Sequence, residues 1–131
     1  MAAGESYPDD LRYNNEHDWA RIEGEEATLG ITWFAQDSLG ELVHFEPPEN
    51  GAEVAKGGSY GEVESVKAVS DLISPLSGTV LEVNPKVVEE PETVNENPYA
   101  DGWLVRISLS AASEVDDLLD AAAYKAFVDE Q

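Results

Sequence analysis

Apolar residues along the chain come in short runs that are separated by glycine, proline and asparagine. Runs of this length with turn residues between them are typical of short β-strands. The pattern therefore predicts a mainly β fold with many strands. The predicted strands are Trp19–Ile22, Ala27–Ile31, Leu42–Phe45, Tyr60–Ser65, Val69–Ser74, Thr79–Val83 and Trp103–Leu109.

Two segments depart from the strand pattern. Thr32 is a good N-cap residue, so a short internal helix is predicted over Trp33–Leu39, and Gly40 is expected to end it. Residues 85–98 show no periodicity and are predicted to form a loop.

The C-terminal part of the chain has a helical pattern. Ser113 is a plausible N-cap, and apolar residues then recur at helical spacing, at Val115, Leu118, Leu119, Ala122 and Ala126. We expect an amphipathic helix that packs on the sheets. At 131 residues the chain is long enough for one domain, which we assign to residues 1–131, with residues 1–10 as a flexible N-terminus.

The composition restricts the possible partners. There are 28 acidic and 7 basic residues, which give a formal net charge of −21, and there is no cysteine. Such a chain repels phosphate backbones, so we expect neither nucleic acid nor a membrane as a partner. Basic surfaces of other proteins are better candidates, and we expect a monomer.

The N-terminus resembles neither a signal peptide nor a transit peptide, and no apolar run is long enough to span a bilayer, which predicts a cytoplasmic protein.

Residues with catalytic chemistry are scarce. His17 and His44 are the only histidines, and their separation does not suit a metal site. The sequence contains no nucleophile elbow, phosphate-binding loop or calcium-binding loop. The many carboxylates show no spacing that singles out an acid–base pair. We therefore expect neither a metal ion nor an enzyme.

One lysine stands out by its position. Lys67 lies midway between two predicted strands, and its neighbours on both sides are small or apolar. The chain has only three other lysines, which lie in turns, a loop or the last helix. The pattern places Lys67 at an exposed hairpin tip, where another enzyme could reach its amine.

Several motifs, taken in order, resemble those of the glycine cleavage system H proteins. They run from about Leu11 to the last helix and cover nearly the whole chain. The motifs are His17-Asp18-Trp19, Gly30-Ile31-Thr32, Ala35-Gln36-Asp37-Ser38-Leu39-Gly40, Glu64-Ser65-Val66-Lys67-Ala68, Ser74-Pro75-Leu76-Ser77-Gly78-Thr79-Val80, Glu82-Val83-Asn84, Val94-Asn95, Asn97-Pro98-Tyr99 and Gly102-Trp103-Leu104.

The resemblance implies a barrel-sandwich hybrid, the fold of lipoyl and biotinyl carriers. It also implies lipoate in amide linkage to Lys67, within the attachment motif of Glu64, Ser65, Val66 and Ala68. For function, the resemblance implies a non-catalytic carrier. Such a carrier takes an aminomethyl group from glycine decarboxylase, the P protein, to a tetrahydrofolate-dependent aminomethyltransferase, the T protein. Dihydrolipoamide dehydrogenase, the L protein, then reoxidises the dithiol. A lipoyl-attaching enzyme is a fourth expected partner.

The resemblance also gives Asp18 a role. It implies that Asp18 contacts the amine of the loaded arm, although the family usually has a glutamate there, which is one methylene longer.

Other carriers fit the sequence less well. Biotinyl carriers have methionines on both sides of their lysine, where this chain has Val66 and Ala68. Lipoyl domains of 2-oxoacid dehydrogenases usually have aspartate directly before the lysine and belong to longer chains. A carrier that relays lipoate to 2-oxoacid dehydrogenase complexes remains an alternative function.

Overall fold

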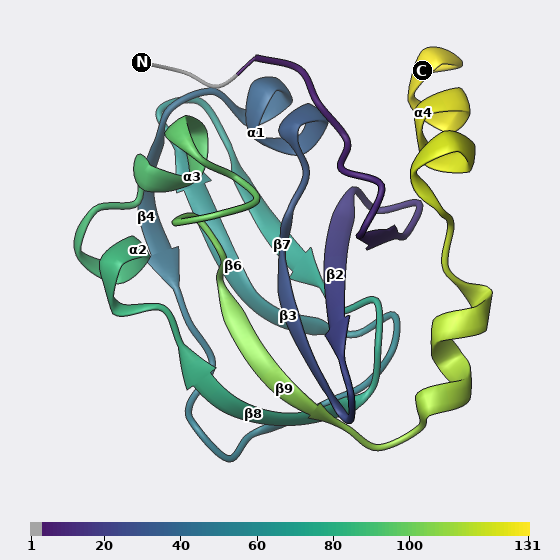
Figure 1. The fold of residues 1–131 in the computed structure, drawn as a ribbon. Helices are drawn as coiled ribbons and strands as arrows, with labels where there is room; N and C mark the ends of the chain where they lie inside the picture. The colour runs from purple at the N-terminus through teal and green to yellow at the C-terminus, as the bar shows by residue number, and fades with distance from the viewer. Residues whose placement is uncertain (1–3) are drawn as a thin grey trace.

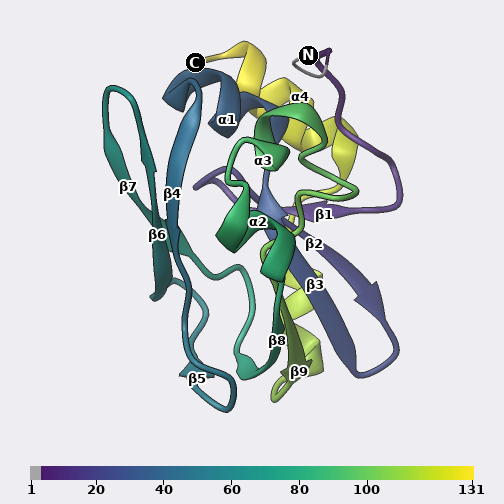
Figure 2. The same ribbon diagram turned by 90° about the vertical axis from the view of Figure 1, so that its left-hand side faces the viewer.

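Two antiparallel β-sheets pack against one apolar core in the computed structural model, which describes residues 4–131 (Figures 1 and 2). One sheet has the order β1-β2-β3-β9-β8-β5, and the other has the order β4-β6-β7. The strands are β1 (Arg12–Tyr13), β2 (Asp18–Glu23), β3 (Glu26–Ile31), β4 (Leu42–Glu46), β5 (Glu53–Val54), β6 (Ser59–Ser65), β7 (Val69–Ile73), β8 (Gly78–Val83) and β9 (Val105–Leu109). The sheets do not close into a barrel, and the predicted sandwich hybrid is confirmed.

The β6–β7 hairpin is held by alternate side chains. Val63 and Leu72 point into the core and are at most 1% exposed, whereas Glu62 and Asp71 lie opposite each other on the outer face. Successive side chains of a strand point to opposite faces, so burial of one set fixes the register of the whole hairpin. The predicted strands of this hairpin are confirmed to within one residue.

Helix α1 (Trp33–Leu39) forms as the sequence predicts. The Thr32 hydroxyl accepts a hydrogen bond from the amide of Ala35 at 3.2 Å, which caps the first turn. Gly40 ends the helix with a φ of 85°, in the left-handed region that glycine adopts without steric cost.

The prediction of a loop over residues 85–98 is wrong. Two short helices occupy this segment, α2 (Pro85–Glu89) and α3 (Thr93–Glu96). Asn84 caps α2 by accepting a hydrogen bond from the amide of Lys86, and Pro85 occupies the first helical position. Each helix has only one or two turns, so neither is long enough to produce a repeating apolar pattern.

The C-terminal helix is present, but its predicted start at Ser113 is wrong. Ala112–Asp117 form a short 3₁₀ helix, η1, and helix α4 covers Ala121–Asp129. Leu119 between them exchanges two backbone hydrogen bonds with Tyr13, which holds the chain extended there. The side chain of Asp120 then caps α4. The helix buries Ala121, Tyr124 and Val128, and the predicted core positions Ala122 and Ala126 are exposed.

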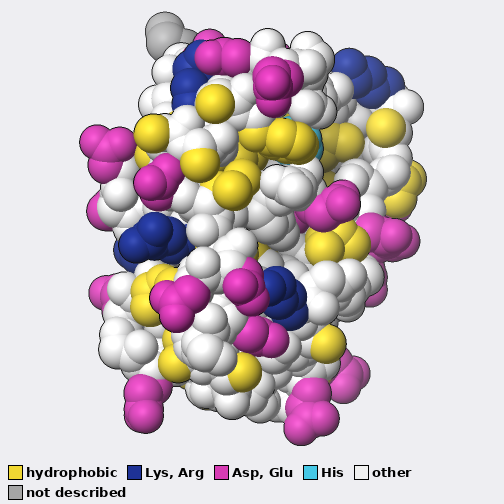
Figure 3. Space-filling model, turned by 90° about the vertical axis from the view of Figure 1, so that its right-hand side faces the viewer, with side chains coloured by type: hydrophobic (Ala, Val, Ile, Leu, Met, Phe, Trp, Pro, Cys, Tyr) yellow, Lys and Arg dark blue, Asp and Glu magenta, His cyan; other side chains and the backbone are white. Residues whose placement is uncertain are grey.

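An aromatic cluster attaches α4 to the larger sheet. The rings of Tyr13 and Tyr124 stack with their centroids 4.6 Å apart, and the fully buried Trp19 belongs to the same cluster. Figure 3 shows the face of the molecule that contains α4, where apolar side chains form a band among scattered acidic ones.

The N-terminal segment was expected to be flexible over residues 1–10, and residues 1–3 lie outside the described residues. In the described part, the Tyr99 hydroxyl donates a hydrogen bond to the carbonyl of Ser6 at 2.7 Å. The ring of Tyr7 packs edge-on against an aromatic ring of α4.

A methyl group at Gly30 should destabilise the fold. A Cβ built at Gly30 lies 2.5 Å from the Trp19 indole, and the indole is fixed because its Nε1 donates a hydrogen bond to the Pro98 carbonyl at 3.0 Å. Overpacking of a core costs roughly 1–3 kcal/mol. We expect Gly30→Ala to lower the free energy of unfolding by that amount in urea denaturation. Gly4→Ala is the control, since nothing lies within 4 Å of a Cβ at Gly4, and equal stability of both variants would contradict the prediction.

Candidate functional site

The turn at the tip of the β6–β7 hairpin has a defined shape. The amide of Ser65 donates a hydrogen bond to the carbonyl of Ala68 at 2.8 Å. The Ser65 hydroxyl accepts hydrogen bonds from the amides of Lys67 and Ala68, at 3.2 and 3.1 Å. Ser65 is 8% exposed, so its hydroxyl fixes the turn from the inner side. The backbone at Lys67 is therefore ordered by hydrogen bonds within the turn.

The tip also rests on the segment between α1 and β4. The amide of Val66 donates a hydrogen bond to the carbonyl of Glu41 at 3.2 Å. A Cβ built at Gly40 would lie 3.7 Å from Cε of Lys67, so the lysine side chain passes over this glycine. Figure 2 shows the hairpin at one edge of the molecule, beside the start of β4.

The side chain of Asn95, on α3, forms hydrogen bonds that hold the segment between α1 and β4 in place. Its side-chain amide donates hydrogen bonds to the carbonyl of Gly40 at 2.9 Å and to the side chain of Gln36 at 3.0 Å. Its side-chain oxygen accepts one from the amide of Leu42 at 2.9 Å. One asparagine thus fixes the end of α1, the glycine under Lys67 and the first residue of β4.

Lys67 is the only lysine without an ion pair in the part of the chain that the structure describes. It is exposed, and no carboxylate lies within 4.0 Å of its Nζ. An unpaired, exposed amine is the one that an acylating enzyme can take most easily. The other lysines form the pairs Lys56–Asp117 at 3.0 Å, Lys86–Asp101 at 3.4 Å and Lys125–Asp129 at 2.6 Å.

Exposed valines surround the tip. Val66 is 70% exposed and Val69 is 60% exposed, and Val43 on the neighbouring strand β4 is 51% exposed. Single exposed apolar residues need no explanation, but here one lies in the turn itself, one on β7 and one on β4, all in the small sheet that carries Lys67, and they make this end of the sheet apolar. Such a patch suits contact with an apolar group or with a partner's surface.

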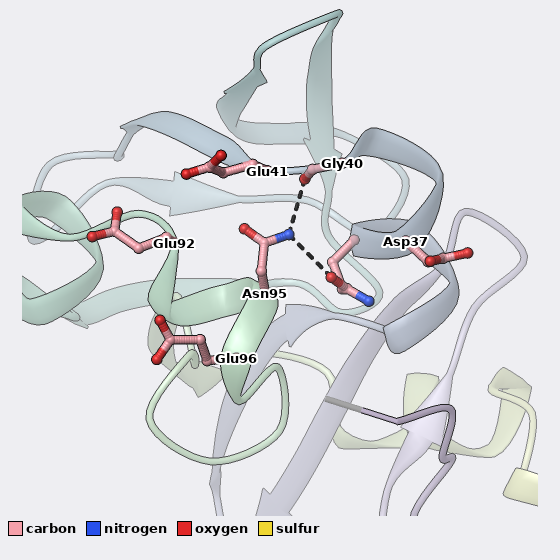
Figure 4. Close-up of a pocket in the computed structure, with 7 residues that line it drawn as sticks. Asp37, Gly40, Glu41, Glu92, Asn95 and Glu96 are labelled. Atoms are coloured by element: carbon pink, nitrogen blue, oxygen red, sulfur yellow. Dashed lines mark hydrogen bonds between the residues drawn. The ribbon is translucent and has the colours of Figure 1, made fainter. Parts of the chain in front are cut away.

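An acidic pocket of about 370 Å³ lies at the foot of the tip (Figure 4). Gly40 belongs to its wall, and the side chain of Lys67 lies within van der Waals reach of a Cβ built on this glycine. In Figure 4 the carboxylates around Asn95 come from α1, the start of β4 and the region of α3. They are those of Asp37, Glu41, Glu92 and Glu96.

The outer face of the small sheet carries a second group of carboxylates. Glu46, Glu62 and Asp71 lie opposite one another on three adjacent strands. Like charges in directly opposite positions destabilise a sheet. This row therefore makes an unfavourable contribution to folding, and its negative charge lies on the outer face of the hairpin whose tip carries Lys67.

Asp18 does not lie in the acidic pocket. It begins β2 and is only 2% exposed, and its carboxylate accepts one hydrogen bond, from the Asn14 amide at 3.4 Å. Burial raises the pKa of Asp18 well above its usual value, and the charge of Glu16 adds to the effect, while the Asn14 hydrogen bond opposes it. The expected contact with a loaded arm would need Asp18 to become accessible.

The residues around Asp18 form a hydroxyl network. The Tyr124 hydroxyl contacts Nδ1 of His17 at 2.7 Å and the Thr32 hydroxyl at 2.8 Å, which joins α4 to the N-terminus of α1. Burial lowers the pKa of His17, so its neutral form is favoured. His17 has a structural role here, and His44 lies on the exposed face of β4, where it contacts Glu46 at 3.0 Å.

No group of three or more histidine, aspartate or glutamate side chains in residues 4–131 is placed so that it could hold a metal ion. No helix in that range combines the length and the apolar character needed to cross a bilayer.

The sequence singles out Lys67 and its motif as the candidate site, but it does not indicate which residues support the tip. Gly40 and Asn95 belong to family motifs, yet Gly40 was otherwise expected only to end a helix, and Asn95 lay in a segment that was predicted to be a loop. The acidic pocket gave no local signal, because its carboxylates come from two segments about 50 residues apart in the sequence.

Comparisons with known proteins agree with one another. Residues 11–131 match the family model described as glycine cleavage H-protein. A glycine cleavage system H protein of Symbiobacterium thermophilum is 53% identical over 123 residues, which cover 94% of this chain and 96% of the relative. A probable glycine cleavage system H protein of Haloarcula marismortui is 50% identical over 118 residues, which cover 90% and 93% of the two chains. The crystal structure of an H protein from Mycobacterium marinum superposes with a TM-score of 0.82 at 42% identity, covering 89% of this chain and 94% of that one.

Removal of the Ser65 hydroxyl should loosen the tip. Ser65→Ala leaves two amides without their acceptor, and loss of such hydrogen bonds costs about 1 kcal/mol. We expect faster hydrogen exchange at the amides of Lys67 and Ala68, measured by NMR. Ser70→Ala is the control on the same hairpin, since the Ser70 hydroxyl contacts only the adjacent Asp71 carbonyl. Unchanged exchange at Lys67 in Ser65→Ala would contradict this account of the turn.

Asp18→Asn should stabilise the protein at neutral pH. Because the pKa of Asp18 is raised in the folded state, the folded protein binds this proton more tightly than the unfolded chain does. The contribution of Asp18 to stability is therefore full below its unfolded pKa and is lost as the pH rises through its folded pKa. We expect the variant to melt higher than wild type at neutral pH, with the advantage shrinking as the pH falls toward 4, about the unfolded pKa of aspartate. Equal melting curves of both proteins at all pH values would show that Asp18 is not perturbed.

Proposed function

The chain belongs to the glycine cleavage H-protein family, and we propose from that membership that it is the lipoyl-bearing shuttle of a glycine cleavage system. Lipoate is joined by an amide bond to Nζ of Lys67. The arm carries an aminomethyl group from the decarboxylase, the P protein, to the aminomethyltransferase, the T protein. The reduced arm then goes to dihydrolipoamide dehydrogenase, the L protein.

The state of Lys67 is the observation that carries the proposal. It is exposed at the tip of an ordered turn, and it is the only lysine of the described chain without a carboxylate partner. Amide formation removes one positive charge, so the formal net charge changes from −21 to −22. A lysine in an ion pair would lose that pair on acylation, and Lys67 has none to lose.

The surroundings of Lys67 suit a long, mostly apolar arm. The attached group supplies a dithiolane that can be reduced and reoxidised, which is chemistry that this cysteine-free chain lacks. Val66 and Val69 offer apolar surface beside the attachment point. Apolar contact is non-directional and modest over so small an area, so an arm can rest there and still leave.

The acidic surfaces beside the tip support docking to basic partners. The pocket includes Gly40, over which the Lys67 side chain passes, and the row of Glu46, Glu62 and Asp71 lies on the outer face of the sheet that carries Lys67. Complementary charge raises the rate of association and orients the encounter. The chain itself then acts by position, as a non-catalytic carrier, and the bond-making groups belong to the partner enzymes.

The proposal is tested by measuring two steps, the attachment of lipoate and the uptake of an aminomethyl group from glycine. The protein is expressed with a lipoyl-attaching enzyme and lipoate, and intact mass should show one lipoyl group. Incubation with a glycine decarboxylase and ¹³C-labelled glycine should then add one labelled aminomethyl group. Peptide mapping should place both additions between Glu64 and Asp71.

Lys67→Arg is the matched control, because it keeps the positive charge but offers no acylatable amine. It should fold as wild type does and gain neither mass. Modification of Lys56, Lys86 or Lys125 would overturn the attachment site. A lipoylated wild-type protein that takes up no label from glycine would overturn the glycine cleavage function.

A further inference from the structure

Among the described residues, one backbone hydrogen bond joins turn residues 66–68 to a residue outside the hairpin. In this bond the amide of Val66 donates to the carbonyl of Glu41 at 3.2 Å. The other backbone hydrogen bond of the turn, from Ser65 to Ala68, lies within the hairpin. A turn that is held only by its own bonds can still pivot about the ends of its two strands. The place of Lys67 relative to the rest of the protein therefore depends on where the Glu41 carbonyl is held.

Asn95 holds the residues on both sides of Glu41. Its side-chain amide donates to the carbonyl of Gly40 at 2.9 Å, and its side-chain oxygen accepts from the amide of Leu42 at 2.9 Å. Both bonds come from one planar carboxamide, so they fix the direction of this backbone segment as well as its distance from α3. The stem of Lys67 passes over the same glycine, since a Cβ built at Gly40 would lie 3.7 Å from Cε of the lysine.

Helix α3 is a firm base for these contacts. Thr93 and Val94 are 6% and 0% exposed, so the helix is anchored in the core directly before Asn95. The carboxamide of Asn95 also donates to the side chain of Gln36 at 3.0 Å, which fixes its orientation toward α1. Figure 4 shows the Asn95 side chain directed from α3 toward Gly40. Asn95 therefore transmits the position of the core to residues 40–42.

We propose that Asn95 is a positioning residue for the attachment of lipoate to Lys67. It acts through residues 40–42 on Val66, and so it holds the turn in the place where a lipoyl-attaching enzyme meets it. This proposal rests on the proposed shuttle function, and it names a residue outside the lysine motif that determines how well the unmodified chain is recognised.

Attachment is the step that depends most on the position of the turn. Before lipoate is attached, an enzyme can reach only the short side chain of Lys67, so it must bind the turn itself. A partner that acts on the finished arm instead meets a group at the end of a long, flexible chain. A turn that is free to pivot must be ordered on binding, and this ordering weakens binding without changing the chemistry in the complex. Loss of Asn95 should therefore raise the KM for the unmodified protein and leave kcat unchanged.

Asn95→Ala tests the proposal in a lipoylation assay with purified lipoyl-attaching enzyme. The KM for the unmodified protein should rise about three- to tenfold, the factor that one ordinary hydrogen bond represents, at constant kcat. Asn84→Ala is the matched control, because Asn84 also makes three side-chain hydrogen bonds. It donates to the carbonyls of Asp101 and Trp103 and accepts from the amide of Lys86, and none of these bonds involves the hairpin or residues 40–42. The control should lower the melting temperature at least as much as Asn95→Ala and leave the KM unchanged.

Asn95→Asp is a second variant, which tests the proposal even if Asn95→Ala does not fold. Its carboxylate can still accept from the Leu42 amide, but it places an oxygen against the carbonyl oxygen of Gly40. The KM should rise at least as far as in Asn95→Ala. Added negative charge alone would strengthen docking to a basic partner and lower the KM, so the two explanations predict changes of opposite sign. Asn84→Asp makes the same chemical change away from the turn and should leave the KM at the wild-type value.

Hydrogen exchange gives a readout that needs no enzyme. In Asn95→Ala the amide of Val66 should exchange about three to ten times faster than in wild type, measured by NMR. The amides of Lys67 and Ala68 should keep their rates, because the Ser65 hydroxyl holds them within the turn. Equal acceleration at all three amides would overturn the proposal, since it would show a general loosening of the hairpin.

The outcomes also separate this proposal from the shuttle function. A wild-type KM in both Asn95 variants overturns the positioning role. A rise of equal size in Asn84→Ala overturns it too, because lost stability alone would then explain the effect. A lipoylated wild-type protein that takes up no label from glycine overturns the shuttle function and leaves the result for Asn95 unaffected, since attachment is measured separately.

Discussion

The burial of Val63 and Leu72 between the two sheets is the constraint on which the presentation of Lys67 depends. An isolated two-stranded hairpin is at best marginally stable in water, and burial of one face gives this hairpin a fixed register. Because side chains alternate along a strand, the same burial sends Glu62 and Asp71 outward. It also places the turn after Ser65 beyond the edge of the core. The exposed lysine and the acidic outer face are thus both consequences of the burial of Val63 and Leu72.

Core burial alone would still leave the tip free to move. The hydrogen bond from Val66 to Glu41 attaches the tip to the α1–β4 segment, and Asn95 attaches that segment to α3. The chain therefore orders the backbone of the turn while leaving the amine of Lys67 without a partner. This combination suits the role proposed for Lys67, because hydrogen bonds hold the backbone of the turn while the amine itself stays accessible.

The sequence was sufficient to predict those elements whose pattern lies within a few neighbouring residues. The alternation of apolar residues predicted the hairpin strands, and Thr32 and Gly40 predicted both ends of α1. The sequence was insufficient to predict those elements whose structure depends on contacts between distant parts of the chain. Residues 85–98 form helices too short to show a period, and the backbone pairing of Leu119 with Tyr13 divides a pattern that would otherwise continue as one helix. For the candidate site, the lysine motif could be recognised in the sequence, but the acidic pocket could not, because it combines residues from separate segments.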